Sequence, residues 1–214
     1  MVVAAYIVGR VHPTETRFEI LFVCTGNQCR SAVAEVITRT LTEGLPVIVS
    51  SAGTDVVHPA PSPRKTLKAA SMLGYDLGEH RSRPLTDEEL DSADLVVGFE
   101  IAHVAAAVIE RKTDRAKTWL LPQLVAALER GPVEPPSNPE ELVGEARARL
   151  AAADEQRSSA SPMLGDQIAD PMGRPARVHQ ATARTIDDLC KRMVPRLLSG
   201  DPSGPDDRAA ERDP

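Results

Sequence analysis

Short apolar runs and longer helical patterns alternate along this chain between residues 17 and 121. The first run, residues 17–23, is rich in β-branched and aromatic side chains, which is typical of a strand buried on both faces of a parallel sheet. A polar loop follows, and apolar residues then recur at helical spacing from Ser31 to a stop at Gly44. Strand, loop and helix in this order form the first half of a βαβ unit.

The same alternation continues through three more strands. The predicted strands are residues 47–49, 94–99 and 118–121, and the predicted helices are residues 62–74, a short helix capped by Thr86 and Glu89, and residues 100–111. Strands that alternate with helices pack as a parallel sheet covered on both sides. We therefore predict an α/β fold with a doubly wound, four-stranded parallel sheet, helices on both faces and a loop for phosphate after the first strand.

After the fourth strand the alternation stops. Residues 131–139 hold four prolines and predict a loop, residues 140–156 predict a surface helix, and residues 158–165 predict a second loop. An amphipathic pattern over His179–Leu198 predicts the closing helix. Residues 131–165 are therefore predicted to form a loop and helix insertion in the domain.

Charge and composition set the limits of that domain. The chain has 214 residues with 31 acidic and 25 basic side chains, a net charge of −6. Residues 200–214 are dominated by Pro, Asp, Gly and Arg and predict a disordered acidic tail, whereas residues 1–16 predict an N-terminal extension. One domain over residues 17–199 remains, and the acidic balance argues against binding to nucleic acids or to anionic membranes.

Cysteine and histidine usage narrows the chemistry further. No apolar run reaches the roughly 18 residues of a membrane span, and no basic segment precedes the apolar N-terminus, so we expect a cytoplasmic protein. Three cysteines without paired Cys-x-x-Cys repeats fit neither a disulfide framework nor a structural zinc site, and the five histidines lack metal-ligand spacing. We expect no metal and no cofactor, and a cysteine that is present for its reactivity.

The loop after the first strand carries that reactivity. Cys24 stands where the strand ends, and a loop that leads into a helix directs backbone N–H groups and the positive end of the helix dipole at one point. Gly26 and Asn27 tolerate the left-handed backbone that such a wrap requires. The same field favours the thiolate form of Cys24. Arg30 can hold two oxygens of a bound phosphate, and Ser31 is placed to donate a hydrogen bond to the thiolate when it is expelled.

The other two cysteines have different predicted roles. Cys190 also precedes an arginine by six positions, but it lies inside the closing helix without a glycine, so we interpret it as a core or semi-exposed residue. Cys29 follows Cys24 by five residues on a loop that curls around a phosphate-sized centre. Its sulfur is therefore expected close enough to form a reversible disulfide with an oxidised Cys24.

The segment from Ile20 to Ala32, ILFVCTGNQCRSA, resembles the phosphate loop of the low-molecular-weight protein tyrosine phosphatases. Further similarities follow in the order of the family and extend the resemblance over residues 18–198. They are Ser51-Ala52-Gly53-Thr54 as the second-strand motif, His80 to Leu85 after the second helix, Asp94 to Val97 with His103 around the third strand, and Asp170-Pro171 as the general-acid loop.

The resemblance implies a cysteine-dependent phosphatase that hydrolyses phosphotyrosine-type monoesters on proteins through a phosphocysteine intermediate. Cys24 would attack phosphorus, and Asp170 would protonate the leaving group and then activate water. The phosphate would be held by Arg30 and by the backbone amides of Thr25, Gly26, Asn27, Gln28 and Cys29. The loop would be supported by a network that joins Asn27 to Ser31, Ser51 and His80. The resemblance also implies that the partners are phosphorylated proteins, tyrosine kinases among them, and that the enzyme is a monomer.

Two stretches depart from the pattern of the phosphotyrosine-specific members, which line the pocket with aromatic residues. Here residues 55–59 read DVVHP and residues 172–175 read MGRP, so neither wall offers Phe, Tyr or Trp. Val56, Val57 and Met172 still provide apolar contact, but stacking on a phenyl ring is lost. The departures leave open which phosphorylated residue the pocket accepts.

Two alternatives remain. An arsenate reductase coupled to a small thiol would share the phosphate loop, whereas a thioredoxin-coupled reductase would need further cysteines, and residues 60–120 contain none. A non-catalytic phosphate-binding module is the second alternative, and it is disfavoured because both the nucleophile and the acid are present.

Overall fold

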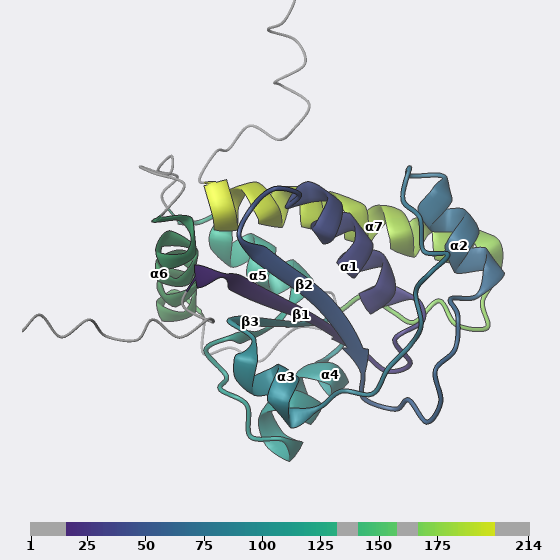
Figure 1. Ribbon diagram of the computed structural model, residues 1–214, viewed down its shortest axis with the longest axis horizontal. Helices are drawn as coiled ribbons and strands as arrows, with labels where there is room; N and C mark the ends of the chain where they lie inside the picture. The colour runs from purple at the N-terminus through teal and green to yellow at the C-terminus, as the bar shows by residue number, and fades with distance from the viewer. Residues whose placement is uncertain (1–15, 132–140, 158–166, 200–214) are drawn as a thin grey trace, which may run out of the picture.

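The fold is described from a computed structural model of the chain, which describes residues 16–131, 141–157 and 167–199. Almost all of the predicted N-terminal extension, the two predicted loops of the insertion and the predicted tail lie outside the described residues. Four strands form one parallel sheet in the order β2-β1-β3-β4, which confirms the predicted fold class (Figure 1). The strands are β1 (Phe18–Cys24), β2 (Val47–Gly53), β3 (Leu95–Gly98) and β4 (Thr118–Leu120).

The central strand β1 is buried on both faces, as its apolar run predicts. Phe18, Ile20 and Phe22 belong to the larger core on one side of the sheet, and the alternate residues Leu21 and Val23 belong to a smaller core on the other side. This period-two division follows from the pleat of a β-strand, in which successive side chains point to opposite faces.

Helices cover both faces of the sheet (Figure 1). The larger core lies beneath α1 (Arg30–Leu41), α5 (Leu121–Leu128) and α7 (Ala176–Val194), which continues as the π-helical turn η5 (Pro195–Ser199). Helix α2 (Arg64–Ser71) packs against α7. The smaller core is covered by α3 (Asp87–Ser92), which has the predicted capping box of Thr86 and Glu89, and by α4 (Ile101–Ala105) with its π-helical continuation η2 (Ala106–Glu110).

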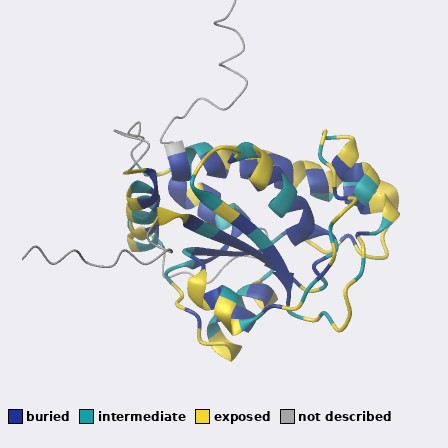
Figure 2. Cartoon of the chain, viewed as in Figure 1, coloured by how far each residue is buried: buried dark blue, intermediate teal, exposed yellow. Residues whose placement is uncertain are grey.

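The region after β4 differs from the prediction in two ways. Helix α5 was not predicted; it begins directly after the three-residue strand β4, and its proline near the N-terminus is favourable because the first helical N–H groups need no partner in the helix. Helix α6 (Leu142–Glu155) was predicted as a surface helix, but one of its faces is part of the larger core (Figure 2). The buried residues recur at helical spacing and are Leu142, Val143, Ala146, Leu150 and Ala153.

The register of the sheet brings the ends of three strands to one edge. Cys24 pairs with Gly53 at the end of β2, and Val23 pairs with Gly98 at the end of β3. In open α/β sheets, ligands bind outside the carboxyl ends of the strands. The reactive loop predicted after β1 therefore opens at the edge where such sites form. Among the described residues, no helix combines the length and the apolar character that crossing a bilayer requires.

Candidate active site

The loop from Cys24 to Arg30 connects the end of β1 to the first turn of α1. Asn27 adopts the left-handed conformation with φ at +47°, whereas Gly26 does not, so the prediction for Gly26 was wrong. A Cβ atom at Gly26 would have no atom within 4 Å, but one at Gly53 would lie 2.7 Å from the Thr25 carbonyl oxygen. The glycine that the loop requires for close packing is thus the one at the end of β2.

The sulfur of Cys24 lies at the base of this loop, next to Ser31. The Cys24 Sγ and Ser31 Oγ atoms are 3.0 Å apart, and both residues are buried. Ser31 Oγ also accepts a hydrogen bond of 2.9 Å from the side-chain amide of Asn27. Because that amide is the donor, the serine hydroxyl proton remains available for the sulfur.

Asn27 connects the loop to the rest of the protein through every polar group of its buried side chain. Its amide also donates to Ser51 Oγ at 2.7 Å, and its side-chain oxygen accepts from the backbone N–H of Arg83 at 2.9 Å. Its backbone carbonyl accepts a hydrogen bond of 2.7 Å from His80 Nε2. The structure thus brings together all four residues that were predicted to support the loop.

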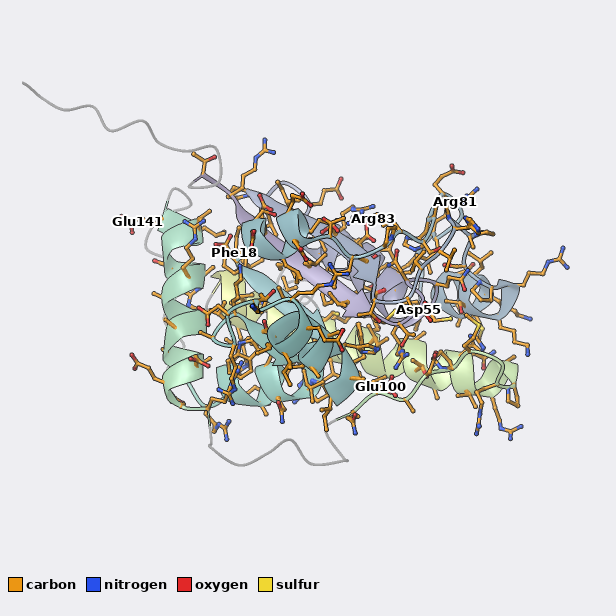
Figure 3. All side chains as sticks on the ribbon, turned by 90° about the horizontal axis from the view of Figure 1, so that it is seen from below. Phe18, Asp55, Arg81, Arg83, Glu100 and Glu141 are labelled. Carbon is orange, nitrogen blue, oxygen red and sulfur yellow. The ribbon has the colours of Figure 1, made fainter. Side chains whose placement is uncertain are left out.

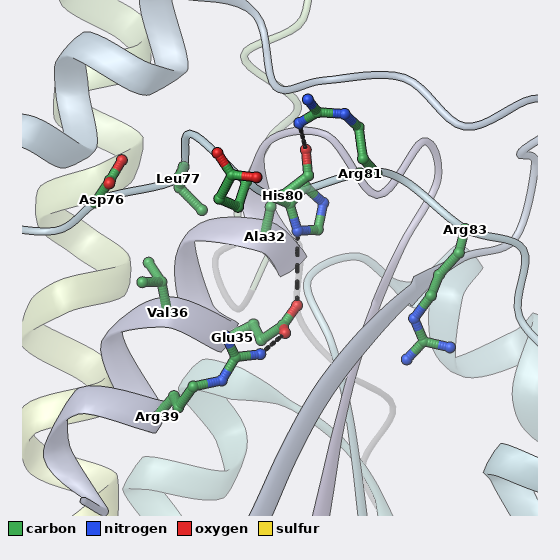
Figure 4. A pocket seen from close by; sticks show the side chains of 10 residues that line it. Ala32, Glu35, Val36, Arg39, Asp76, Leu77, His80, Arg81 and Arg83 are labelled. Carbon is green, nitrogen blue, oxygen red and sulfur yellow. Dashed lines mark hydrogen bonds and ion pairs between the residues drawn. The ribbon is translucent and has the colours of Figure 1, made fainter.

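Glu35 completes this network and was not predicted. It accepts a hydrogen bond of 2.5 Å from Ser51 Oγ, and its carboxylate lies 3.8 Å from His80 Nδ1. A cavity of about 460 Å³ lies behind the loop, and the facing side chains of Glu35 and His80 are on its wall (Figure 4). The available sequence signal was the position of Glu35 one helical turn after Ser31, on the same face of α1.

Arg30 is buried, with its side chain 1% exposed, and acidic groups surround its guanidinium. Nη1 donates to Glu100 Oε2 at 2.5 Å and to the Ile168 carbonyl at 3.0 Å, and Nη2 lies 3.2 Å from Asp170 Oδ2. Its Nε is buried and has no hydrogen-bond partner among the residues that the structure describes. Glu100 was not predicted as a site residue, because it lies 70 positions from Arg30.

His103 contacts the loop from the other side. Its Nδ1 accepts hydrogen bonds from the backbone N–H groups of Phe99 and Glu100, so the proton of the neutral ring is on Nε2, which lies 3.1 Å from Thr25 Oγ1. Burial, helped by the charge of Arg30, lowers the pKa of His103 to about 4. The ring is therefore a neutral donor at physiological pH. From the sequence, His103 was placed only in the region of the third strand, and no role in the site was predicted for it.

Asp170 and the two predicted pocket walls flank the loop. The Asp170 side chain is 44% exposed, and its second carboxylate oxygen accepts from the backbone N–H of Met172. On the other wall, the backbone N–H of Asp55 donates to the Thr25 carbonyl at 2.9 Å. Val57 and Met172 are both exposed. Figure 3 shows the side chains of the described residues, with Asp55 and Glu100 labelled.

Gln28 and Cys29 point in different directions. The Gln28 side chain reaches outward to the Pro61 carbonyl at 3.3 Å. Cys29 is buried and accepts a hydrogen bond of 3.2 Å from Thr66 Oγ1. Burial raises the pKa of the Cys29 thiol to about 11. Cys190 is fully buried in α7, in agreement with its predicted place in the core.

Within the described parts of the chain, no cluster of three or more His, Cys, Asp or Glu residues could hold a metal ion.

Known proteins are similar to this chain in sequence and in fold. A family model described as low molecular weight phosphotyrosine protein phosphatase matches residues 19–152, which include the loop from Cys24 to Ser31 and end before Asp170. The protein-arginine-phosphatase of Bacillus subtilis (strain 168) is 39% identical over 106 residues, covering 47% of this chain and 69% of that protein. The low molecular weight protein-tyrosine-phosphatase Etp of Escherichia coli (strain K12) is 36% identical over 104 residues, covering 49% and 69%.

Among solved structures, a cysteine-to-serine variant of the YwlE arginine phosphatase, with a phosphorylated active-site serine, superposes with a TM-score of 0.60. It is 25% identical in sequence, and the superposition covers 84% of this chain and 95% of that one.

Proposed function

Because the chain belongs to the low molecular weight phosphotyrosine protein phosphatase family, whose catalysis depends on a cysteine, we propose that Cys24 is the nucleophile of a protein phosphatase. One observation carries this assignment. Cys24 lies at the base of a loop that opens at the carboxyl edge of the sheet, with Ser31 Oγ 3.0 Å from its sulfur. Neither Cys29 nor Cys190 occupies such a position.

In the first step, the Cys24 sulfur attacks phosphorus in line with the leaving group, and a phosphocysteine forms. Backbone amides of residues 25–30 and the Arg30 guanidinium hold the equatorial oxygens. The buried Arg30 Nε supports this role, since no described residue is its hydrogen-bond partner and a phosphate oxygen would satisfy it. Glu100 and the Ile168 carbonyl hold Nη1 and thereby orient the guanidinium.

Asp170 supplies the proton that the leaving group needs. Its ion pair with Arg30 and its partial exposure support this role, because the carboxyl group lies near the guanidinium and within reach of solvent. The same carboxylate then activates the water that hydrolyses the phosphocysteine. When the thiolate is expelled, Ser31 donates a hydrogen bond to it, and the network of Asn27, Ser51 and His80 keeps the loop rigid.

We propose that the substrates are phosphotyrosine residues on proteins, and that tyrosine kinases are among these proteins. We also propose that the enzyme acts as a monomer. A second candidate is phosphoarginine. Asp55 contacts the loop through its backbone, Glu100 and Asp170 lie on Arg30, and such acidic side chains suit a guanidinium better than a phenyl ring. The Bacillus subtilis relative is named a protein-arginine-phosphatase, which supports this candidate.

A panel of peptides that carry phosphotyrosine, phosphoarginine or phosphoserine tests these proposals, with arsenate reduction by a small thiol run alongside. Cys24→Ser is expected to abolish dephosphorylation. Cys190→Ser, the same substitution at a buried cysteine outside the loop, is expected to keep the activity of the folded enzyme. Equal losses in both variants, or arsenate reduction without dephosphorylation, would contradict the assignment.

A further inference from the structure

The segment from Asp170 to Pro175, here called the acid loop, carries the proposed general acid and leads into α7. Four basic residues belong to this segment and to the first turns of α2 and α7. They are Arg64, Lys65, Arg174 and Arg177, and they are named the basic rim. All four are exposed, and the proposed hydrolysis uses none of their side chains.

Direct contacts hold these three elements together. Lys65 Nζ donates a hydrogen bond of 2.9 Å to the Arg174 carbonyl, which joins the first turn of α2 to the acid loop. In the same turn, Thr66 Oγ1 lies 2.9 Å from His179 Nδ1, in the first turn of α7. Helix α2 also packs against α7, as Figure 1 shows. The basic rim is therefore one cluster of charges and not four scattered ones.

The basic rim is continuous with the phosphate site. Thr66 Oγ1 donates a hydrogen bond of 3.2 Å to the sulfur of Cys29, the residue before Arg30 in the phosphate loop. At the other end of the acid loop from Arg174, Asp170 forms an ion pair with Arg30. Residues that flank a phosphorylated side chain bound at this loop therefore come within reach of the basic rim.

No acidic side chain of the described residues forms an ion pair with any member of the basic rim. The nearby acid, Asp170, is paired with Arg30 instead. Exposed arginines elsewhere do have such partners, and Arg39, Arg111 and Arg192 are examples. In a chain of net charge −6, four positive charges without acidic partners form a local surface that attracts an anionic group of another molecule.

We propose that the basic rim binds acidic side chains next to the phosphorylated residue, so that the substrates are phosphorylated protein segments rich in Asp and Glu. This inference rests on the proposed function and adds a substrate class to it. The phosphate loop recognises the phosphoryl group, and the basic rim recognises the segment that carries it. Arginine suits this role, because its guanidinium can hold a carboxylate through two hydrogen bonds.

The charge of the whole chain favours a short acidic segment over a long polyanion such as a nucleic acid. A long polyanion would meet the acidic remainder of the surface as well, and its binding would be opposed there. A short segment contacts the basic rim alone. At physiological ionic strength, charges more than about 8 Å away are largely screened, so the local positive charge decides the interaction.

Peptides that differ only in their flanking residues test the proposal on the full chain. Each carries the phosphorylated residue that the wild type hydrolyses, with glutamates, alanines or lysines on both sides. The reference substrate is p-nitrophenyl phosphate, which has no flanking residues.

The test variant is the double substitution Arg64→Glu and Arg177→Glu, which leaves the hydrogen bond of Lys65 to the acid loop in place. The matched control is Arg17→Glu with Arg130→Glu. It changes the net charge by the same amount at exposed positions, one directly before β1 and one after the end of α5.

For the wild type, we expect kcat/KM to be about tenfold higher with the glutamate peptide than with the lysine peptide, the combined effect of a few exposed ion pairs. The difference should lie mainly in KM and should shrink at about 0.5 M salt. In the test variant the order should reverse, with the lysine peptide preferred. Its kcat with p-nitrophenyl phosphate should stay within about twofold of the wild-type value, which shows that the variant is folded. The control variant should keep the wild-type order.

Equal kcat/KM values for the three peptides in the wild type would overturn the proposal. So would a preference for glutamate that the test variant retains, or that the control variant loses to the same degree. In each of these cases, turnover of p-nitrophenyl phosphate by the wild type would leave the phosphatase assignment standing. If the wild type hydrolyses neither this substrate nor any peptide, the proposed function itself has failed.

Discussion

Glu100 Oε2 lies 2.5 Å from Arg30 Nη1, so a carboxylate holds the arginine that the sequence pattern assigns to a phosphate. A second acid, Asp170, forms an ion pair with the other terminal nitrogen, and its Oδ2 lies 3.2 Å from Arg30 Nη2. Within the described part of the chain, Nε has no hydrogen-bond partner. Arg30 is thus oriented by its terminal nitrogens, and the nitrogen nearest the chain remains free for an anion.

The first prediction concerns Glu100. Glu100→Gln keeps a hydrogen-bond acceptor but removes the charge that fixes Arg30, so we expect kcat to fall about tenfold, the effect of weakening one charged hydrogen bond. Inhibition by inorganic phosphate should not weaken, because the substitution also removes a negative charge beside the anion. Steady-state kinetics with an aryl phosphate measure both quantities. Glu88→Gln, at an exposed position of α3, is the control, and an unchanged kcat in Glu100→Gln would contradict this role.

Asn27 gives the second prediction. Asn27→Ala removes three side-chain hydrogen bonds and leaves a residue without a polar side chain in the left-handed conformation. We expect the free energy of unfolding to fall by about 1–3 kcal/mol and kcat to fall at least about tenfold. Urea unfolding and steady-state kinetics test this. The exposed amide of the adjacent residue serves for comparison, since Gln28→Ala should lose little stability.

His103 predicts a dependence of stability on pH. Its folded-state pKa of about 4 is below the unfolded value of 6.5, so the unfolded chain binds more protons between these values. The stabilising contribution is complete above about pH 6.5 and is lost as the pH falls toward 4, by about 3 kcal/mol in total. His103→Gln can keep the hydrogen bonds but cannot titrate. The free energy of unfolding, measured with urea between pH 7 and 4.5, should therefore fall less steeply with decreasing pH in the variant than in the wild type. Parallel curves for the two proteins would contradict the assignment.

Helix α6 gives a prediction about stability alone. Leu150 is buried in the larger core, so Leu150→Ala should lower the free energy of unfolding by about 2–5 kcal/mol. Figure 1 places α6 near the start of β1, at the end of the sheet opposite the phosphate loop, so kcat of the folded variant should stay the same. Glu155→Ala, at an exposed position of the same helix, is the control. A loss no larger than that of the control would show that α6 is a surface element, as its composition suggested.

Local patterns in the sequence predicted most of the fold. The strands were found because each is a continuous apolar run, and the phosphate loop because its residues are consecutive. Helix α5 was missed because its apolar residues continue directly from β4 with no polar break between strand and helix. The burial of α6 was missed because its many Ala, Glu and Arg residues concealed an apolar face.

The contacts of the site were less predictable. Glu100, His103 and Thr66 contact loop residues that lie 37 to 78 positions away, and only the completed fold brings these side chains together. Glu35 is the exception, since it lies one turn from Ser31 on the same helix face. Asp170 was located only through a family resemblance, because no local pattern relates it to Arg30 across 140 positions.

The central claim is that Cys24 carries the phosphoryl group and that Asp170 activates the water that removes it. Asp170→Ala reacted with p-nitrophenyl phosphate tests both parts at once, because this leaving group departs without a proton while hydrolysis of the phosphocysteine loses its base. Rapid acid quench, intact-mass measurement and peptide mapping should find one phosphoryl group accumulated on Cys24, and much less of it in the wild type. A phosphoryl group on another residue, or turnover by Asp170→Ala at the wild-type rate with no accumulated adduct, would contradict the account.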